Sequence, residues 1–463
     1  MGRSMSARSR SGTWALRTMR DLYGEMLLKR LLCERDDARR AFEEARYLLP
    51  LAVHDVLELR NLGYLGAAGS AFRRSFEILE PAGEDYVIES PRLIGAAERR
   101  SVRSQSRAFY IASFTNARIR ARSGVVLAGD MALLDAEERE VALVDDQIEY
   151  DPAIFARHSD GRVWCVANES ETLDFSEAFV SLLGPWSYHF GHWILEYLPK
   201  VATAVASGAL PAMPFLVDSE MSQANRDALR FFLPAGFEIV EVPETATVRA
   251  ARLWCAPSIS YRPALEKTNE RWRKAGPAYL TAPPSRIARA VDILLAAYDP
   301  VLGASPAGSR LYLARPHDLW RKLLNHREIE GIARSFGFEI VYPEQFDFMT
   351  QVALVRGAQH IVGPEGSAMF LTFFAREGTT VGIFNHHVTD NVFLYSGVLE
   401  YRGLDVTVLC GRTVRAHDDT YQGFTQYADY EIDPARFVEY LETKLGVAYD
   451  ASRVDEFKGV ESP

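Results

Sequence analysis

Residues 360–367, His-Ile-Val-Gly-Pro-Glu-Gly-Ser, join an apolar stretch typical of a buried strand to a turn with two glycines, and a helical pattern follows toward Phe374. From residue 308 onward, a strand followed by a helix already occurs twice before this stretch. Such a repeat predicts parallel strands covered by helices. Ligands of open α/β sheets collect where strands end and helices begin, so we expect a binding site at this edge.

A second α/β pattern lies upstream. The segment 108–167 alternates apolar and polar positions between turn signals such as Ser123-Gly124, which indicates a β-rich stretch. Expected strands then lie at 179–183, 214–218, 237–242 and 248–256, with helices at 189–207 and 223–232. The fold class is therefore α/β, with two Rossmann-like domains that face a cleft.

The chain has 463 residues, more than one hydrophobic core usually serves. Prolines and a glycine at 275–285 favour a linker between two domains. Residues 14–60 have a helical pattern. We expect a helical extension at 1–84, an α/β domain with a β-rich entry segment at 85–275 and a second α/β domain at 285–425. Residues 426–463 should form a short helix near 434–445 followed by a tail.

Composition excludes several classes of protein. A net charge of -10 argues against nucleic acid as the main partner, because that binding depends on Lys and Arg. No apolar run reaches the roughly 18 residues that a membrane-spanning helix needs. The four cysteines lack the C-x-x-C spacing of a zinc knuckle. We therefore expect a cytosolic protein with reduced thiols.

The first 32 residues mix basic side chains with large apolar ones near helical spacing, for example Arg17 and Arg20 beside Trp14 and Tyr23. A helix that lies on a membrane surface has this pattern, so peripheral membrane association is one interpretation. A helix docked on the body of the protein has it too, and we favour that interpretation.

Basic residues gather after one of the buried strands. Arg315, Arg321 and Lys322 lie within eight positions, and three cations near a strand end suit a diphosphate. Ordinary surface charge explains the same spacing equally well. Asn325 with Glu328 resembles a capping box at the start of the next helix, so we favour a structural role for that pair over a contact with the ligand.

The glycine turn adds further candidates for ligand contact. Gly363 and Gly366 allow the backbone to approach a ligand, and Ser367 can cap the following helix. The carboxylate of Glu365 would repel a phosphate, so it should face a sugar, a ribose or the acceptor. Glu344, in the preceding strand–helix loop, either binds ribose hydroxyls or is a solvated loop acid.

The helix expected at 189–207 carries the candidate base. His192 and Glu196 are four residues apart and share a face, so the carboxylate can orient the imidazole as a general base. A histidine with only structural hydrogen bonds is the alternative. With His189 the pair could also form a metal site, but no fourth ligand is visible. Pro199 cannot donate to the Leu195 carbonyl and predicts a kink.

These motifs resemble those of glycosyltransferase family 61. The counterparts, in order within residues 107–385, are Gly191-His192-Trp193 with Leu198-Pro199, Arg315 and Arg321 to Asn325, Gly337-Phe338 with Pro343-Glu344, and Gly363 to Ser367. The chain departs from the family pattern at Glu365, where the family usually has histidine, and at residues 368–371. The resemblance implies a GT-B architecture and inverting, metal-independent transfer from a nucleotide sugar.

The expected function is transfer of a sugar from a nucleotide diphosphate to a hydroxyl of a glycan or lipid-linked glycan, as in capsule or other polysaccharide biosynthesis. The donor is a co-substrate, and no metal or other cofactor is expected. His192 with Glu196 would act on the acceptor and Glu365 near the sugar. Glu365 also motivates an alternative, a catalytically silent binding subunit of a polysaccharide assembly. An epimerase or dehydrogenase would need a G-x-G-x-x-G turn, which the sequence lacks.

Overall fold

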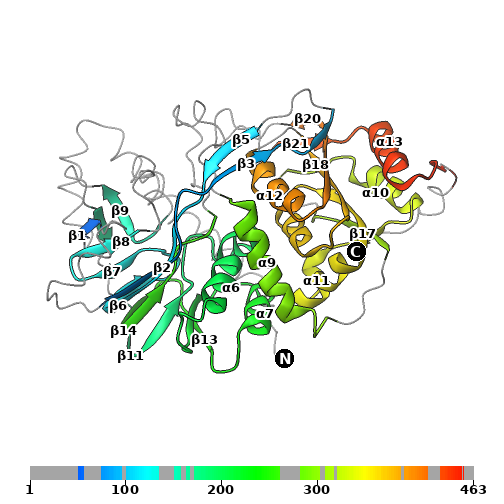
Figure 1. Ribbon diagram of the computed structural model, residues 1–463. Coiled ribbons are helices and arrows are strands. Elements are labelled where there is room, and N and C mark those ends of the chain that lie inside the picture. Colours follow the sequence, from blue (N-terminus) through cyan, green and yellow to red (C-terminus); the bar gives the residue numbers. More distant parts are fainter. Residues whose placement is uncertain are drawn as a thin grey trace, which may run out of the picture.

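The structure is a computed structural model that describes residues 51–56, 74–95, 101–134, 151–157, 163–166, 171–260, 282–302, 308–316, 321–386, 390–415, 428–450 and 452. Most strands of these residues belong to two sheets, which we name the large sheet and the small sheet (Figure 1). The predicted α/β class is confirmed. No helix in these ranges combines the length and apolar character needed to cross a membrane.

The large sheet has a parallel half and an antiparallel half. Its order is β13 (Ile239–Val242), β12 (Phe215–Asp218), β11 (Thr172–Ser181), β14 (Thr247–Cys255), β6 (Phe109–Arg120), β7 (Val126–Ala128), β8 (Met131–Leu133), β1 (Leu51–Val56), β10 (Val163–Val166) and β9 (Ile154–Arg157), with β2 (Arg74–Glu80) also paired to β6. Strands β11 to β14 run parallel, and β6 meets β14 antiparallel. Because β11 and β12 end at the same edge, the chain segments that follow them lie close together.

The small sheet is entirely parallel in the described residues. Its order is β16 (Glu339–Val341), β15 (Ser309–Leu313), β17 (Ala358–Pro364), β18 (Thr380–Asn385), β19 (Asp405–Cys410) and β4 (Arg92–Ile94). From β15 the chain goes first to β16 on one side and then to β17 on the other. The space between the carboxyl ends of β15 and β17 is therefore the topological switch point, the usual ligand position in such sheets.

Helices fill the space between the two sheets (Figure 1). They are α6 (Leu198–Ala206), α7 (Gln223–Phe232), α9 (Pro284–Tyr298), α11 (Phe348–Gly357) and the 3₁₀ helix η7 (Ser367–Phe374). Their buried side chains form one continuous apolar cluster, in which Phe215 of the large sheet and Leu311 of the small sheet both take part. Burial of apolar surface thus stabilises the two sheets as a unit.

The predicted helical extension at 1–84 is wrong where the structure describes it. β1 and β2 are strands of the large sheet, and β2 pairs with six residues of β6. The alternation of Phe76 and Ile78 with polar neighbours is a strand pattern, and pairing with an open sheet edge outweighs helical propensity. Residues 1–50, including the basic segment of the first 32, and 261–281, with most of the expected linker, lie outside the described residues.

Two short elements also cross the expected domain boundaries. β4 lies in the small sheet, although we placed residues 85–275 in one domain with the large sheet. The helix α13 (Pro434–Leu445) has the predicted bounds, and Asp433 caps it by accepting from the amide of Ala435 at 3.0 Å. Its Phe437 packs with Phe384 of β18, so this helix is part of the small-sheet unit.

Candidate functional site

The carboxyl ends of β15 and β17 bring charged residues together at the switch point. Arg315 follows β15, and its Nη1 donates to the backbone carbonyl of Glu365, directly after β17, at 3.4 Å. Burial and the nearby Arg321 lower the pKa of Arg315 to about 10, so this guanidinium is still cationic at neutral pH. A half-buried cation therefore lies where a nucleotide would bind in such a sheet.

Arg321 and Glu365 form an ion pair across this edge. The carboxylate side chain is 7% exposed and the guanidinium 18%. Arg321 has φ of 63°, a left-handed conformation that is uncommon for a residue with a Cβ and that clusters at functional sites. We expected Glu365 to face a sugar or a ribose, but the structure directs its carboxylate to the guanidinium that we assigned to the diphosphate.

The glycine turn has different roles from those expected. A Cβ on Gly363 would lie 2.4 Å from the Leu313 carbonyl oxygen, so this glycine is needed for close approach of β17 to β15. Gly366 has φ of 171°, which is extended backbone open to any residue. Gly366 is the N-cap of η7, and Ser367 is the first residue of that helix. No side chain makes a capping hydrogen bond at this helix end. The predicted cap by Ser367 is therefore wrong.

The opposite wall of the site comes from the segment after β11. His192 ends the short helix α5 (Phe190–His192), and its Nδ1 lies 2.8 Å from Glu196 Oε1. A carboxylate can only accept, so Nδ1 carries the proton and Nε2 is the proton acceptor. The Trp186 ring lies parallel to the imidazole at 5.9 Å between centroids, and His189 meets it edge to face. The imidazole is thus oriented by three neighbours.

The kink predicted from Pro199 takes the form of a π-turn, η4 (Trp193–Tyr197), between α5 and α6. The hydroxyl of Ser260 donates to the Leu195 carbonyl at 2.8 Å, replacing the hydrogen bond that Pro199 cannot make. Ser258 donates to the Glu196 carbonyl at 3.3 Å. We did not predict these two serines. Pro199 indicated a carbonyl in need of a donor, but no local pattern points to a loop that follows β14.

A pocket of about 70 Å³ separates the two walls. From the large-sheet side it is lined by His189, Gly191, His192, Leu195 and Glu196, and from the small-sheet side by Arg321, Glu365, Gly366, Ser367 and Phe370. A Cβ on Gly191 would lie 3.3 Å from atoms of Ser367 and Phe370, so the glycine permits close contact of α5 and η7. The structure therefore brings the candidate base and a candidate diphosphate-binding arginine to one pocket.

A second pocket, of about 100 Å³, lies beside the first. Arg321 lines both, and Arg315 and the exposed Lys322 line the second. The backbone amide of Lys322 donates to Asp429 at 2.9 Å, which fixes the loop that carries the cations. Three predicted cations thus surround one cavity next to the pocket of His192.

Two candidates lie outside these pockets. Asn325 Nδ2 donates to the Ile432 carbonyl at 2.8 Å, and its Oδ1 accepts from the Ile432 amide at 3.2 Å. Its side chain therefore holds the segment just before α13 and does not cap α10 (His326–Ser335). Glu344 is exposed in the 3₁₀ turn η6 (Pro343–Gln345) after β16. Among the residues described, no three His, Cys, Asp or Glu side chains are arranged so that they could hold a metal ion.

The comparison with protein families agrees with this geometry. Residues 190–382 match the model of the family described as Glycosyltransferase 61. The matched segment begins at α5 and ends in β18, so it contains every residue that lines the pocket of His192 except His189. A search of curated proteins found no match. Residues 190–382 of this chain therefore belong to glycosyltransferase family 61.

Proposed function

We propose that this protein is an inverting, metal-independent glycosyltransferase with a GT-B arrangement of its two sheets. It would move a sugar from a nucleotide diphosphate to a hydroxyl of a glycan or lipid-linked glycan in polysaccharide biosynthesis. The observation that carries this proposal is the shared pocket: the His192–Glu196 pair faces Arg321 and Glu365 across a small cavity. A base on one side and cations on the other suit direct displacement of a diphosphate.

In the proposed reaction, Nε2 of His192 takes the proton of the acceptor hydroxyl. The Glu196 carboxylate, 2.8 Å from Nδ1, stabilises the imidazolium that forms. The acceptor oxygen forms a bond to the anomeric carbon while the bond from that carbon to the diphosphate oxygen breaks. The electron pair leaves with the diphosphate. Because attack and departure occur on opposite faces, the anomeric carbon is inverted.

Charge on the departing diphosphate would be compensated from the small sheet. Arg315, Arg321 and Lys322 surround the second pocket, and the first amides of η7 begin at Gly366 and Ser367. Cations and helix amino ends fixed in advance stabilise developing negative charge. Glu344 lies after β16, the neighbour of β15, and could receive the ribose at the same edge.

Glu365 has a specific part in this proposal. Its carboxylate holds Arg321 before the donor binds, so the diphosphate must compete for the same guanidinium. Once displaced, the carboxylate can accept hydrogen bonds from hydroxyls of the donor sugar. We further propose a cytosolic location, where the basic first 32 residues could contact a membrane that holds a lipid-linked acceptor.

A second candidate function is a catalytically silent nucleotide-sugar or glycan-binding subunit of a polysaccharide assembly. The observation that favours it is the same ion pair, because Arg321 already has an anionic partner within the protein. A site kept in this form would bind a donor weakly and would not compensate the leaving charge.

A donor screen separates the two candidates. Purified protein is incubated with each common nucleotide sugar, with and without a mixture of glycan acceptors, and both the midpoint of thermal unfolding and the release of nucleoside diphosphate are recorded. The transferase predicts that one donor raises the midpoint and that acceptor accelerates release. Stabilisation without release from any donor would favour the binding subunit, and no stabilisation by any donor would contradict both.

A further inference from the structure

In the described part of the chain, the backbone passes between the large and small sheets three times. It leaves the large sheet after β2, returns before β6, and leaves again between β14 and β15. The first two passages flank β3 (Asp85–Glu89) and β5 (Ser101–Gln105), which pair with each other, and the third includes α9. The relative position of the two pocket walls depends on these passages as well as on the shared apolar core.

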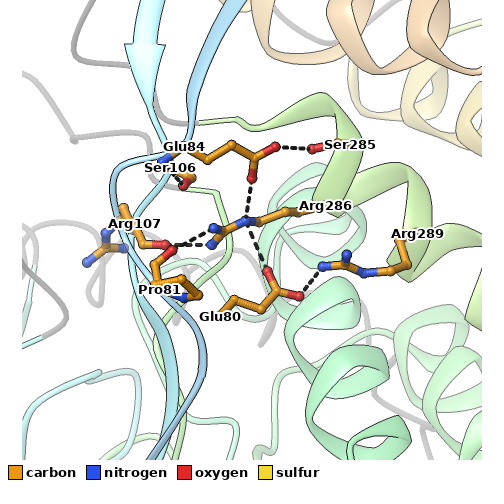
Figure 2. A network of polar contacts seen from close by, with 8 residues as sticks. All are labelled: Glu80, Pro81, Glu84, Ser106, Arg107, Ser285, Arg286 and Arg289. Atoms are coloured by element: carbon orange, nitrogen blue, oxygen red, sulfur yellow. Dashed lines mark hydrogen bonds and ion pairs between the residues drawn. The ribbon is translucent and has the colours of Figure 1, made fainter.

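All three passages meet at Arg286, near the start of α9 (Figure 2). Its Nη2 donates to the Pro81 carbonyl of the first passage at 2.7 Å, and its Nη1 donates to the Arg107 carbonyl of the second at 2.7 Å. Its Nε faces the carboxylates of Glu80 at 3.0 Å and Glu84 at 3.2 Å. The residue is only 5% exposed.

Further bonds join the passages around this arginine. Ser285 beside it donates to Glu84 at 3.2 Å, and the amides of Gly83 and Ser106 bond the two early passages to each other. Arg289, one turn along α9, reaches Glu80 as well, but its side chain is 55% exposed (Figure 2). Arg286 is therefore the member of the network that contacts both early passages from within the buried region.

Further hydrogen bonds connect this network to the large-sheet wall of the pocket, which carries His192. Nη1 of Arg107 donates to the Ser258 carbonyl at 3.4 Å, and the Ser258 hydroxyl donates to the Glu196 carbonyl at 3.3 Å. Glu196 is the partner of His192. A contiguous set of hydrogen bonds thus runs from the start of α9 to the π-turn beside the pocket.

We propose that Arg286 is a positioning residue: it fastens the three passages between the sheets and thereby fixes the separation of His192 from Arg321 and Glu365. A planar guanidinium with five N–H donors suits this place, because it donates to two carbonyls and to the Glu84 carboxylate in different directions and also forms an ion pair with Glu80. Lysine has one flexible ammonium group and cannot reach all four. The kinetic part of this inference rests on the proposed function, and the structural part does not.

The test compares Arg286→Lys and Arg286→Met with Arg289→Met, a control on the same helix that removes an exposed partner of the same Glu80. Each is assayed well below its unfolding temperature. In the Arg286 variants, we expect kcat to fall on the order of 10- to 100-fold, because a misplacement of about 1 Å costs that much, while nucleoside diphosphate binding stays within about twofold. Arg289→Met should change neither quantity more than about twofold.

Hydrogen exchange supplies a readout that does not require transfer activity. Amides of residues 190–197 should exchange faster in the Arg286 variants, and those of β17 should not. Unchanged kcat together with unchanged exchange at 190–197 in folded Arg286→Met would overturn the proposal, since the shared core alone would then hold the walls. If that variant does not fold, Glu84→Gln, which removes one partner, should show the same changes at smaller size, and their absence there would overturn it too.

The two proposals can fail separately. A parent protein with no transfer from any donor removes the proposed function, while faster exchange at 190–197 in Arg286→Met would still support the positioning role. Transfer by the parent that is unaffected in every Arg286 variant, together with unchanged exchange at 190–197, removes the positioning role and leaves the proposed function in place.

Discussion

The two walls of the pocket are built in opposite ways. On the large-sheet side, His192 already has its carboxylate partner, and Ser260 supplies the hydrogen bond that Pro199 cannot make. On the small-sheet side, Arg321 has a left-handed backbone and is held by Glu365, an anion from the same chain. The difference indicates that the proposed base is assembled before any ligand binds, whereas the proposed anion site would have to exchange an internal partner for the donor.

The largest effect should follow from removal of the base. We expect His192→Ala to lower the rate of transfer about 10²- to 10⁴-fold, the usual contribution of a general base, and to leave the dissociation constant of the nucleoside diphosphate within about twofold. Steady-state kinetics and calorimetric titration measure the two quantities. An equal loss of transfer rate and of nucleoside diphosphate affinity would place His192 in donor binding. A transfer rate equal to that of the parent would remove its proposed role.

The next largest effect should follow from removal of the Ser260 hydroxyl, which donates to a carbonyl of the π-turn η4. Ser260→Ala should lower the free energy of unfolding by roughly 1–3 kcal/mol, because the buried Leu195 carbonyl loses the donor at 2.8 Å. Pro199→Ala restores an N–H that can reach that carbonyl, so the double variant should regain part of the loss. Chemical denaturation measures both. Simple addition of two losses would show that the proline and the serine are not coupled.

Removal of the Glu365 charge should strengthen binding of a nucleoside diphosphate at the anion site. Glu365→Gln should tighten nucleoside diphosphate binding by roughly tenfold, since a nearby like charge at a partly buried site costs about 1–4 kcal/mol. Arg321→Gly should weaken it, without backbone strain, because glycine accepts a φ of 63°. Glu339→Gln, at an exposed carboxylate at the amino end of β16 and therefore away from this edge, is the matched control and should change little. Weaker binding in Glu365→Gln would mean that the carboxylate positions Arg321 for the ligand.

The smallest effect concerns the loop that leads to His192. Asp218, at the end of β12, accepts from the Ser187 hydroxyl and the Arg122 amide, and burial raises its pKa from 3.8 to about 6. Because the folded state holds this proton more tightly, the group's contribution to stability is complete below pH 3.8 and is lost as the pH rises through about 6. Between pH 5 and 7, the parent should lose about 1 kcal/mol of unfolding free energy relative to Asp218→Asn. Denaturation at both pH values measures this difference, and a constant difference would contradict it.

Sequence patterns predicted the elements whose signals are local. α7 and α13 have the expected bounds because apolar spacing and the caps Ser222 and Asp433 lie within a few residues of each helix. β2 and β4 were missed because their pairing partners, β6 and β19, are distant or later in the chain.

The same division applies to the site. The His192–Glu196 pair follows from helical spacing and was predicted. The Arg321–Glu365 pair was not, because it depends on a left-handed residue in a loop that meets a different strand end. Ser258 and Ser260 could not be found either, since only the folded chain brings their loop to the π-turn.

A crystal structure of the protein with a bound nucleoside diphosphate tests the central claim most directly. The account predicts that the diphosphate contacts Arg315 and Arg321 beside the amino end of η7, that Glu365 has turned from Arg321, and that His192 faces the position of the missing sugar. A diphosphate bound away from the β15–β17 switch point, or one bound there while Glu365 still pairs with Arg321, would contradict it.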